Sequence, residues 1–349
     1  MSRPQQVFLH VGLPKTGTTY LQRCFADNED WLRARGVSYP TLGREQLYGH
    51  HNLARALEGE PLMDADYGAR GAVEVFRSAL EVAEPRVLIS CEQLSTLSET
   101  AANKLGEALE GHDVSVVVYL RRRSAVAVSM WSELTKWGRL ESFEEFLAGE
   151  LLGASAWVLR PEIVLRKVHA MVGGDEMKVI VYDHLVEDEV ELCGHFVEHA
   201  LGLSPGGGLT LPERSFNASN DAATLEVVRA IHGVRRRRGQ EVDIRAHEAL
   251  RTFLERDAES VEVIEQVRAL TAARGVELDL RRLDSEWREQ DRWMRRELGA
   301  SVLNPASDDE LFRPRERASV RVLRASELYG EVPVEVFERL ADRAPSQRR

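Results

Sequence analysis

The stretch that decides the fold is VFLHVGLPKTGTTYLQRC, residues 7–24. Its first five residues are apolar except for one histidine, and they predict a buried strand over 7–11. Gly12 and Gly17 bracket a tight turn, and apolar side chains then recur at helical spacing, so a helix should begin near Thr18. A strand, a glycine turn and a helix in this order direct backbone N–H groups and the positive helix end toward an anion. The stretch therefore predicts a phosphate site.

Side chains within the turn strengthen this prediction. Lys15 adds a full positive charge, and the hydroxyls of Thr16, Thr18 and Thr19 add hydrogen-bond donors. The spacing nearly matches the ATP-binding pattern G-x-x-x-x-G-K-[ST], but Thr18 stands at the lysine position and the lysine comes three residues earlier. The alternative is an unoccupied glycine turn between a strand and a helix.

Composition excludes several classes of protein. The chain has 349 residues, of which 43% are hydrophobic and 30% charged, as in soluble globular proteins. Its net charge of −11 argues against nucleic-acid partners and anionic membranes. No run approaches the ~18 apolar residues of a membrane span, and no signal segment is visible. Cys24, Cys91 and Cys193 are scattered without metal-like pairing, so we expect reduced cysteines, no metal site and a cytoplasmic protein.

Outside this stretch, strands and helices alternate as far as residue 204. The expected elements are a helix at 69–84, a strand at 86–90, a helix at 99–110, and strands at 114–120 and 178–182 followed by a helix at 189–201. This alternation predicts an α/β fold with a parallel sheet, which places ligands at the carboxyl ends of the strands. Lys15, Glu92 and Arg121 lie at those ends.

A Pro- and Gly-rich segment, 205–212, marks a change of pattern. After it we expect only helices, at about 219–236, 244–257, 260–273, 279–298 and 333–343. We therefore predict a P-loop-like α/β core over 1–204, and a mainly helical part over 205–349 that packs on the core and completes the cleft. The arginine run at 235–238 is interpreted as a solvated helix end.

A second motif follows the strand at 114–120. Arg121 ends that strand, and Ser129 comes eight residues later on the next predicted helix. A guanidinium group engages phosphate oxygens in a bidentate manner and stays charged. A P-loop NTPase would instead place an aspartate after such a strand to hold Mg²⁺. The alternative interpretation is that the arginines at 121–123 only flank a helix.

Together the two motifs resemble those of sulfotransferases of the bacterial type, which use 3′-phosphoadenosine-5′-phosphosulfate (PAPS). The resemblance spans residues 7 to about 220. It implies that Lys15 stabilises the leaving phosphate oxygen, and that the loop from Thr16 to Thr19, including the Gly17 amide, holds the 5′-phosphate. It also implies that Arg121 and Ser129 bind the 3′-phosphate. No metal is required, because sulfuryl transfer moves a less charged group than phosphoryl transfer.

The resemblance extends to further residues. Tyr20 stands where related enzymes often stack tryptophan on adenine, although simple helix packing would also explain a tyrosine there. Arg214 and Asn217 fall where several sulfotransferases close a basic loop on the 3′-phosphate, but the G-x-x-G element of the cytosolic enzymes is absent. The run KVIVYDHL at 178–185 resembles the Y-E-D-L-like run of the family, with Asp183 and His184 as departures.

The acceptor hydroxyl needs a general base. Glu92 stands just beyond the strand at 86–90, where sulfotransferases commonly offer a histidine or glutamate, and a carboxylate in a partly dry cleft can serve as a base. His51, beside His50, is the second candidate because histidine titrates near neutrality. For either histidine, a structural role is the alternative.

These motifs predict a sulfotransferase that moves a sulfuryl group from PAPS to an acceptor hydroxyl, or less readily to an amine. They identify only the donor, so a small molecule, a carbohydrate and a lipid remain open as the acceptor. Two other functions fit the same loop: a P-loop nucleotide kinase or NTPase with a degenerate loop, and a nucleotide-binding protein without turnover.

Overall fold

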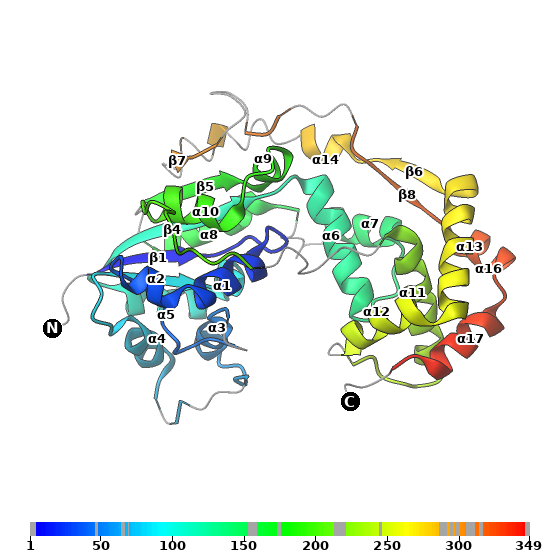
Figure 1. The fold of residues 1–349 in the computed structure, drawn as a ribbon, viewed down its shortest axis with the longest axis horizontal. Helices are drawn as coiled ribbons and strands as arrows, with labels where there is room; N and C mark the ends of the chain where they lie inside the picture. Colours follow the sequence, from blue (N-terminus) through cyan, green and yellow to red (C-terminus); the bar gives the residue numbers. More distant parts are fainter. Residues whose placement is uncertain are drawn as a thin grey trace. The chain divides into compact units, whose positions relative to one another are not determined.

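Figure 1 shows the computed structural model of the chain. It describes residues 5–45, 48–63, 67–68, 70–152, 159–172, 176–212, 221–243, 246–285, 292–293, 296, 301–304, 311–313 and 317–345. Contacts divide the chain into two compact units, each assembled from several segments. Unit 1 comprises Met1–Arg122, Arg160–Phe216 and Glu286–Pro314, and unit 2 comprises Arg123–Leu159, Asn217–Ser285 and Arg315–Arg349.

Unit 1 is built around a parallel sheet of six strands in the order β2-β3-β1-β4-β5-β7. The strands are β1 Gln6–His10, β2 Val37–Ser38, β3 Arg86–Ser90, β4 Asp113–Leu120, β5 Met177–Val181 and β7 Ser301–Val302. The predicted α/β fold is confirmed, and the four expected strands lie within one residue of their predicted ends. The edge strands β2 and β7 were not expected, because two residues are too few to show a period.

The sheet is buried on both faces. In β4, every residue after Asp113 is buried, as expected for a central parallel strand that reads as a continuous apolar run. Phe8 and Val117 join one core cluster with residues of helix α1, Thr18–Asp27. Val7 and Leu9 alternate with Phe8 and point to the opposite face, where they are also buried.

Ten helical segments of unit 1 surround this sheet in the part of the chain that the structure describes. They are α1 Thr18–Asp27, α2 Glu29–Arg33, α3 His51–Glu58, α4 Ala72–Leu80, the 3₁₀ turn η1 Glu92–Thr96, α5 Glu99–Leu109, α8 Pro161–Met171, α9 Tyr182–Glu187, α10 Leu192–His195 and the π-helical turn η2 Phe196–Ala200. Helices α3, α4 and α5 pack against one another, and α1 packs against α10. The single helix expected at 189–201 is therefore two short elements, α10 and η2.

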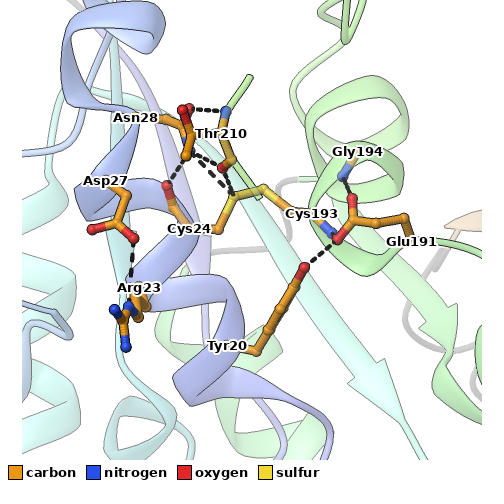
Figure 2. Close-up of a disulfide and its surroundings, with 9 residues drawn as sticks. All are labelled: Tyr20, Arg23, Cys24, Asp27, Asn28, Glu191, Cys193, Gly194 and Thr210. Carbon is orange, nitrogen blue, oxygen red and sulfur yellow. Dashed lines mark hydrogen bonds and ion pairs between the residues drawn. A yellow bond between two sulfur atoms is a disulfide. The ribbon is translucent and has the colours of Figure 1, made fainter. Parts of the chain in front are cut away.

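A disulfide joins Cys24 on α1 to Cys193 on α10, with the two Cα atoms 6.4 Å apart (Figure 2). This corrects the expectation that the cysteines are reduced. This pairing could not be predicted, because 169 positions separate the two residues and the packing of α1 on α10 brings them together. The disulfide also removes the observation on which the expectation of a cytoplasmic protein depended. Cys91 is buried and unpaired.

Asn28 lies beside the disulfide and binds the segment that contains Thr210. Its Nδ2 donates to the carbonyl oxygens of Cys24 and Thr210, both 2.7 Å away, and its Oδ1 accepts from the amide of Thr210 (Figure 2). The segment predicted as a linker, 205–212, is therefore held against the end of α1.

Unit 2 combines helices with one pair of strands. Its elements are α6 Arg123–Lys136, α7 Phe143–Leu152, α11 Ala222–Arg237, α12 His247–Arg256, α13 Ala258–Arg274, β6 Val276–Asp279, α14 Arg281–Ser285, β8 Ser319–Val322, α16 Ala325–Glu331 and α17 Val334–Arg343. Strands β6 and β8 pair antiparallel, so the expectation of helices alone is wrong. Each strand has only four residues, separated by 39 positions that hid their relation. Among the described residues, no helix combines the length and apolar character needed to cross a bilayer.

The core of unit 2 joins helices from separate segments of the chain. Apolar side chains of α11, α12, α13 and α17 form one cluster that includes Ile231, Val267 and Phe337. Helices α6 and α7 belong to this unit, because α6 packs on α11 and α14. At the end of α11, Arg235 is buried and donates to the carbonyl oxygen of Ala344, whereas residues 236–238 are exposed.

Candidate functional site

The candidate site lies at the carboxyl ends of adjacent strands in unit 1. Residue His10 in β1 pairs with Ser90 in β3 on one side and with Val117 in β4 on the other. The residues that follow these strands therefore come out at the same edge of the sheet. A Cβ atom placed on Gly12 would lie 3.0 Å from the Cβ of Glu92, so the glycine turn and the candidate base are in direct contact.

The glycine turn has a well-defined backbone. Its start continues the pairing with β4, since the amide of Leu13 donates to the carbonyl oxygen of Tyr119 over 3.0 Å. Lys15 has φ at +68°, a left-handed conformation that L residues with a side chain rarely adopt and that often marks functional turns. Gly17 has φ at +81°, and a Cβ there would lie 2.6 Å from a methyl carbon of Leu192. The positive φ favours glycine at this position, and any larger residue would also have to displace the Leu192 side chain.

Helix α1 begins directly after this turn. Gly17 is its N-cap, and a glycine has no side chain with which to cap the first amides of the helix. The uncapped amides and the helix dipole favour an anion in this position. The hydroxyl of Thr16 is buried and donates to the carbonyl oxygen of Leu13 over 2.5 Å, so it stabilises the turn itself. Thr18 is buried and Thr19 is exposed.

Arg121 reaches the turn from the end of β4. Its Nη1 donates to the carbonyl oxygen of Lys15 over 2.8 Å, and its guanidinium lies 5.4 Å from the ring centroid of Tyr182. A Cβ on Gly17 would lie 3.2 Å from the same tyrosine ring. The predicted neighbourhood of Lys15, Glu92 and Arg121 at one sheet edge therefore exists. Ser129, the predicted partner of Arg121, lies on α6 in unit 2.

Tyr20 has a partner within unit 1. Its hydroxyl donates to Oε1 of Glu191 over 2.7 Å, and Glu191 caps α10 by accepting from the amides of Cys193 and Gly194 (Figure 2). The tyrosine thus connects the first turn of α1 to the helix at the far end of the disulfide. Its predicted stacking on adenine stays a prediction.

The two candidate bases, Glu92 and His51, lie together. Nε2 of His51 is 3.9 Å from Oε2 of Glu92, and both side chains are partly exposed. The same Oε2 accepts a hydrogen bond of 2.9 Å from Nε2 of Gln22 on α1. Nδ1 of His51 lies 3.5 Å from Sγ of Cys91. The two residues that the sequence suggests as alternative bases are therefore neighbours in one cluster.

His50 has a structural role. Its Nδ1 accepts from the amide of Ser90 over 3.1 Å, and its Nε2 lies 2.9 Å from the carbonyl oxygen of Pro40, to which it donates. Burial lowers the pKa of His50 to about 3. With both ring nitrogens engaged and the ring fully buried, His50 is unsuited to accept a substrate proton.

The departures from the Y-E-D-L-like run also have structural roles. Asp183 accepts from the backbone amide of Arg122 over 2.8 Å, just after β4 ends. His184 donates from Nδ1 to the carbonyl oxygen of Asn304, because its Nε2 accepts from the amide of Arg313. These contacts hold the segment that supplies β7 against the end of β5.

Two further residues at the site, Gln22 and Tyr182, were not predicted from the sequence. Gln22 lies one helical turn beyond the loop, and its only sequence signal was a polar residue next to the apolar positions of α1. Tyr182 directly follows β5, where an aromatic residue at a strand end gave a weak signal. The predicted residues Arg214 and Asn217 lie outside the described residues. Within the described ranges, no three histidine, cysteine, aspartate or glutamate side chains gather in a metal-binding arrangement.

Comparison with known proteins finds few matches. No family model and no curated protein matches the chain. Among solved structures, a sulfotransferase from Alicyclobacillus acidocaldarius is similar, with 17% sequence identity and a TM-score of 0.39. The match covers 69% of this chain and 98% of that one.

Proposed function

We propose that this protein is a sulfotransferase that takes a sulfuryl group from PAPS and transfers it to an acceptor hydroxyl. The observation that supports the proposal best is the arrangement of the turn at the sheet edge. Lys15 occupies a left-handed position ahead of an uncapped helix, Arg121 contacts its carbonyl oxygen, and Glu92 packs against the start of the same turn.

The residues of the turn fit a 5′-phosphosulfate group. The first amides of α1 and the hydroxyls of Thr18 and Thr19 would hold the 5′-phosphate. Arg121 keeps further N–H groups besides the one that contacts Lys15, and these would bind the 3′-phosphate. PAPS supplies the sulfuryl group and a phosphate leaving group.

The chemistry asks two things of the protein. Glu92 or His51 would accept the proton of the acceptor hydroxyl as its oxygen forms a bond to sulfur on the face opposite the leaving group. Lys15 would neutralise the phosphate oxygen as its bond to sulfur breaks, an electrostatic role directed at charge that develops during transfer. The products are a sulfate ester and adenosine 3′,5′-bisphosphate (PAP), and the proton ends on the base.

An arginine at the end of β4 favours this reaction over ATP chemistry. P-loop NTPases use a carboxylate from such a strand to hold Mg²⁺. Here the strand ends in Arg121, which brings positive charge instead. We propose that side-chain charge from Lys15 and Arg121 does what the metal does in those enzymes.

The test combines ligand binding with a product search. PAPS and PAP should raise the melting temperature, because a ligand that binds only the folded state stabilises it. Mg·ATP should raise it less, since it lacks a 3′-phosphate. Mass spectrometry should then find a sulfate ester when PAPS is supplied with a panel of small alcohols, sugars and lipids. Greater stabilisation by Mg·ATP would overturn the proposal in favour of a kinase or NTPase.

A further inference from the structure

A buried amide touches the candidate base from the side of the phosphate helix. Gln22 on α1 is 2% exposed, and its Nε2 donates to Oε2 of Glu92 over 2.9 Å. Oε2 is also the oxygen that faces Nε2 of His51, at 3.9 Å. The other oxygen, Oε1, receives no hydrogen bond or ion pair from the described residues. The carboxylate is thus held by one oxygen, and the second is left for another group.

The contact is enclosed by a tight arrangement of backbone. A Cβ atom on Gly49 would lie 2.7 Å from Oε1 of Gln22 and 2.6 Å from Nε2 of His51. A Cβ on Gly12 would lie 3.0 Å from the Cβ of Glu92. Two glycines therefore allow the backbone to approach these three side chains closely, which restricts how each can rotate. A buried amide would be costly without a hydrogen-bond partner, and here the partner is the candidate base.

We propose that Gln22 is a positioning residue for the proton transfer: it fixes the carboxylate of Glu92 through Oε2, so that Oε1 faces the acceptor hydroxyl. The inference rests on the proposed function. Gln22 lies on the helix whose N-terminus would bind the 5′-phosphate, so one rigid element sets the position of both the donor and the base. A misplacement of about 1 Å at a reacting group can cost about 10²-fold in rate, which makes such a link effective.

Other titratable groups near Glu92 bear on any pH measurement. They are His51 on α3, Cys91 at the end of β3, and Tyr39 after β2. Burial raises the pKa of the Cys91 thiol and of the Tyr39 phenol well above their usual ranges, so both stay neutral under assay conditions. A change in the pH profile then reports on Glu92 and His51.

The first experiment needs no acceptor. Protein labelled with ¹⁵N at the glutamine side-chain amides is compared with its Glu92→Gln variant, and the Gln22 signal is assigned from its loss in Gln22→Met. The Gln22 signal should move in Glu92→Gln and stay in place in Glu58→Gln, a matched change at a glutamate that bonds Ser98 instead. If the chemical shift of the Gln22 amide is the same in Glu92→Gln as in the wild type, the inference is wrong, whatever reaction the protein catalyses.

The second experiment measures turnover with an acceptor found in the product search. Gln22→Met keeps the length of the side chain and removes its donor. It should lower kcat by about 10–100-fold with little change in KM for PAPS, on the scale of a misplaced reacting group. The pH profile of kcat should also differ between Gln22→Met and the wild type, a change that a merely structural role of Gln22 would not cause.

Two controls separate positioning from folding. Gln93→Met changes an exposed glutamine next to Glu92 and should leave kcat unchanged. In the Glu92→Gln background, Gln22→Met should cause no further loss, because its effect acts through the carboxylate. An unchanged pH profile in Gln22→Met, or fully additive losses, would overturn the inference. If the wild type sulfates no acceptor, the proposed function fails, and the amide signal alone decides whether Gln22 holds Glu92.

Discussion

Arg121 donates from Nη1 to the carbonyl oxygen of Lys15 across 2.8 Å. The bond joins the end of the central strand β4 to the one residue of the glycine turn that has a side chain and a left-handed backbone. A guanidinium has several N–H groups in a fixed plane, so it can hold this carbonyl and still face a ligand. The arginine therefore shapes the turn in addition to any contact with phosphate.

Arg121→Ala should weaken binding of PAP by ~1.5–3 kcal/mol, about 10–150-fold in Kd, the scale of a hydrogen bond to a charged group. Calorimetric titration with PAP measures this directly. Arg86→Ala is the matched control, because Arg86 also donates to backbone carbonyl oxygens, those of Arg35 and Leu201. Arg86 lies at the amino end of β3, whereas the candidate site lies at the carboxyl ends of the strands. Equal losses of affinity in the two variants would contradict the assignment.

Lys15→Gly should separate charge from backbone strain. Glycine adopts a φ of +68° without the cost that a side chain imposes, so the variant should melt at the same temperature or higher. Turnover should nevertheless fall, and fall more than the affinity for PAP, if the lysine charge acts on the leaving oxygen. Melting curves, calorimetry and initial rates give the three quantities. Unchanged turnover in Lys15→Gly would remove the lysine from the mechanism.

Glu92→Gln and His51→Asn should distinguish the two candidate bases. Loss of a general base costs about 10²–10⁴-fold in turnover, with little change in affinity for PAPS. We expect this loss for Glu92→Gln and a smaller one for His51→Asn, whose ring lies 3.9 Å from the carboxylate. If the histidine variant is inactive and the glutamine variant active, the base is His51.

Reduction of the Cys24–Cys193 disulfide should destabilise the protein. The bond closes a loop across 169 positions, and disulfides commonly contribute ~2–4 kcal/mol. Dithiothreitol should lower the melting temperature of the wild type and have no such effect on the Cys24→Ser/Cys193→Ser double variant. Cys91→Ala should respond to dithiothreitol as the wild type does. Alkylation of all three cysteines in the unfolded chain without a reductant would show that the disulfide is absent.

Stability should fall as the pH is lowered from 6.5 toward 3. Burial lowers the pKa values of His10 and His50 to about 3, whereas in the unfolded chain they are near 6.5. Between these values the unfolded state binds more protons, so each histidine contributes a slope of about 1.4 kcal/mol per pH unit. His50→Gln keeps an acceptor and a donor without titrating and should flatten the slope of denaturation free energy against pH. An unchanged slope in His50→Gln would contradict this prediction.

The sheet and the turn could be predicted because their signals are local. The run DVSVVVYL contains enough apolar residues to mark β4 by itself, and the glycines of residues 12–17 mark the turn. The neighbourhood of Glu92 and Lys15 followed from parallel pairing alone, since residues after adjacent strands come out at one edge. For these features, spacing and residue type were sufficient.

The remaining features depend on contacts between distant segments. The pairing of Cys24 with Cys193, the bond from Gln22 to Glu92 and the pair β6–β8 each join positions that no local period relates. His50 and His51 are adjacent and identical in type, yet one is enclosed by Pro40 and Ser90 while the other faces Glu92. Only the fold decides which of two such neighbours can meet a substrate.

The interleaving of the two units has a consequence for how the chain is made. The side chain of Asn304 accepts a hydrogen bond from the amide of Val181 and donates one to its carbonyl oxygen. Asn304 and strand β7 are synthesised after most of unit 2. Domains usually fold one after another as they emerge from the ribosome. Here the edge of the sheet in unit 1 is complete only when residues 301–304 have been synthesised. Until then β5 presents an unpaired edge to the cell. The pairing of β5 with β7 and the contacts of Asn304 therefore form only after the first two segments of unit 2 have been made.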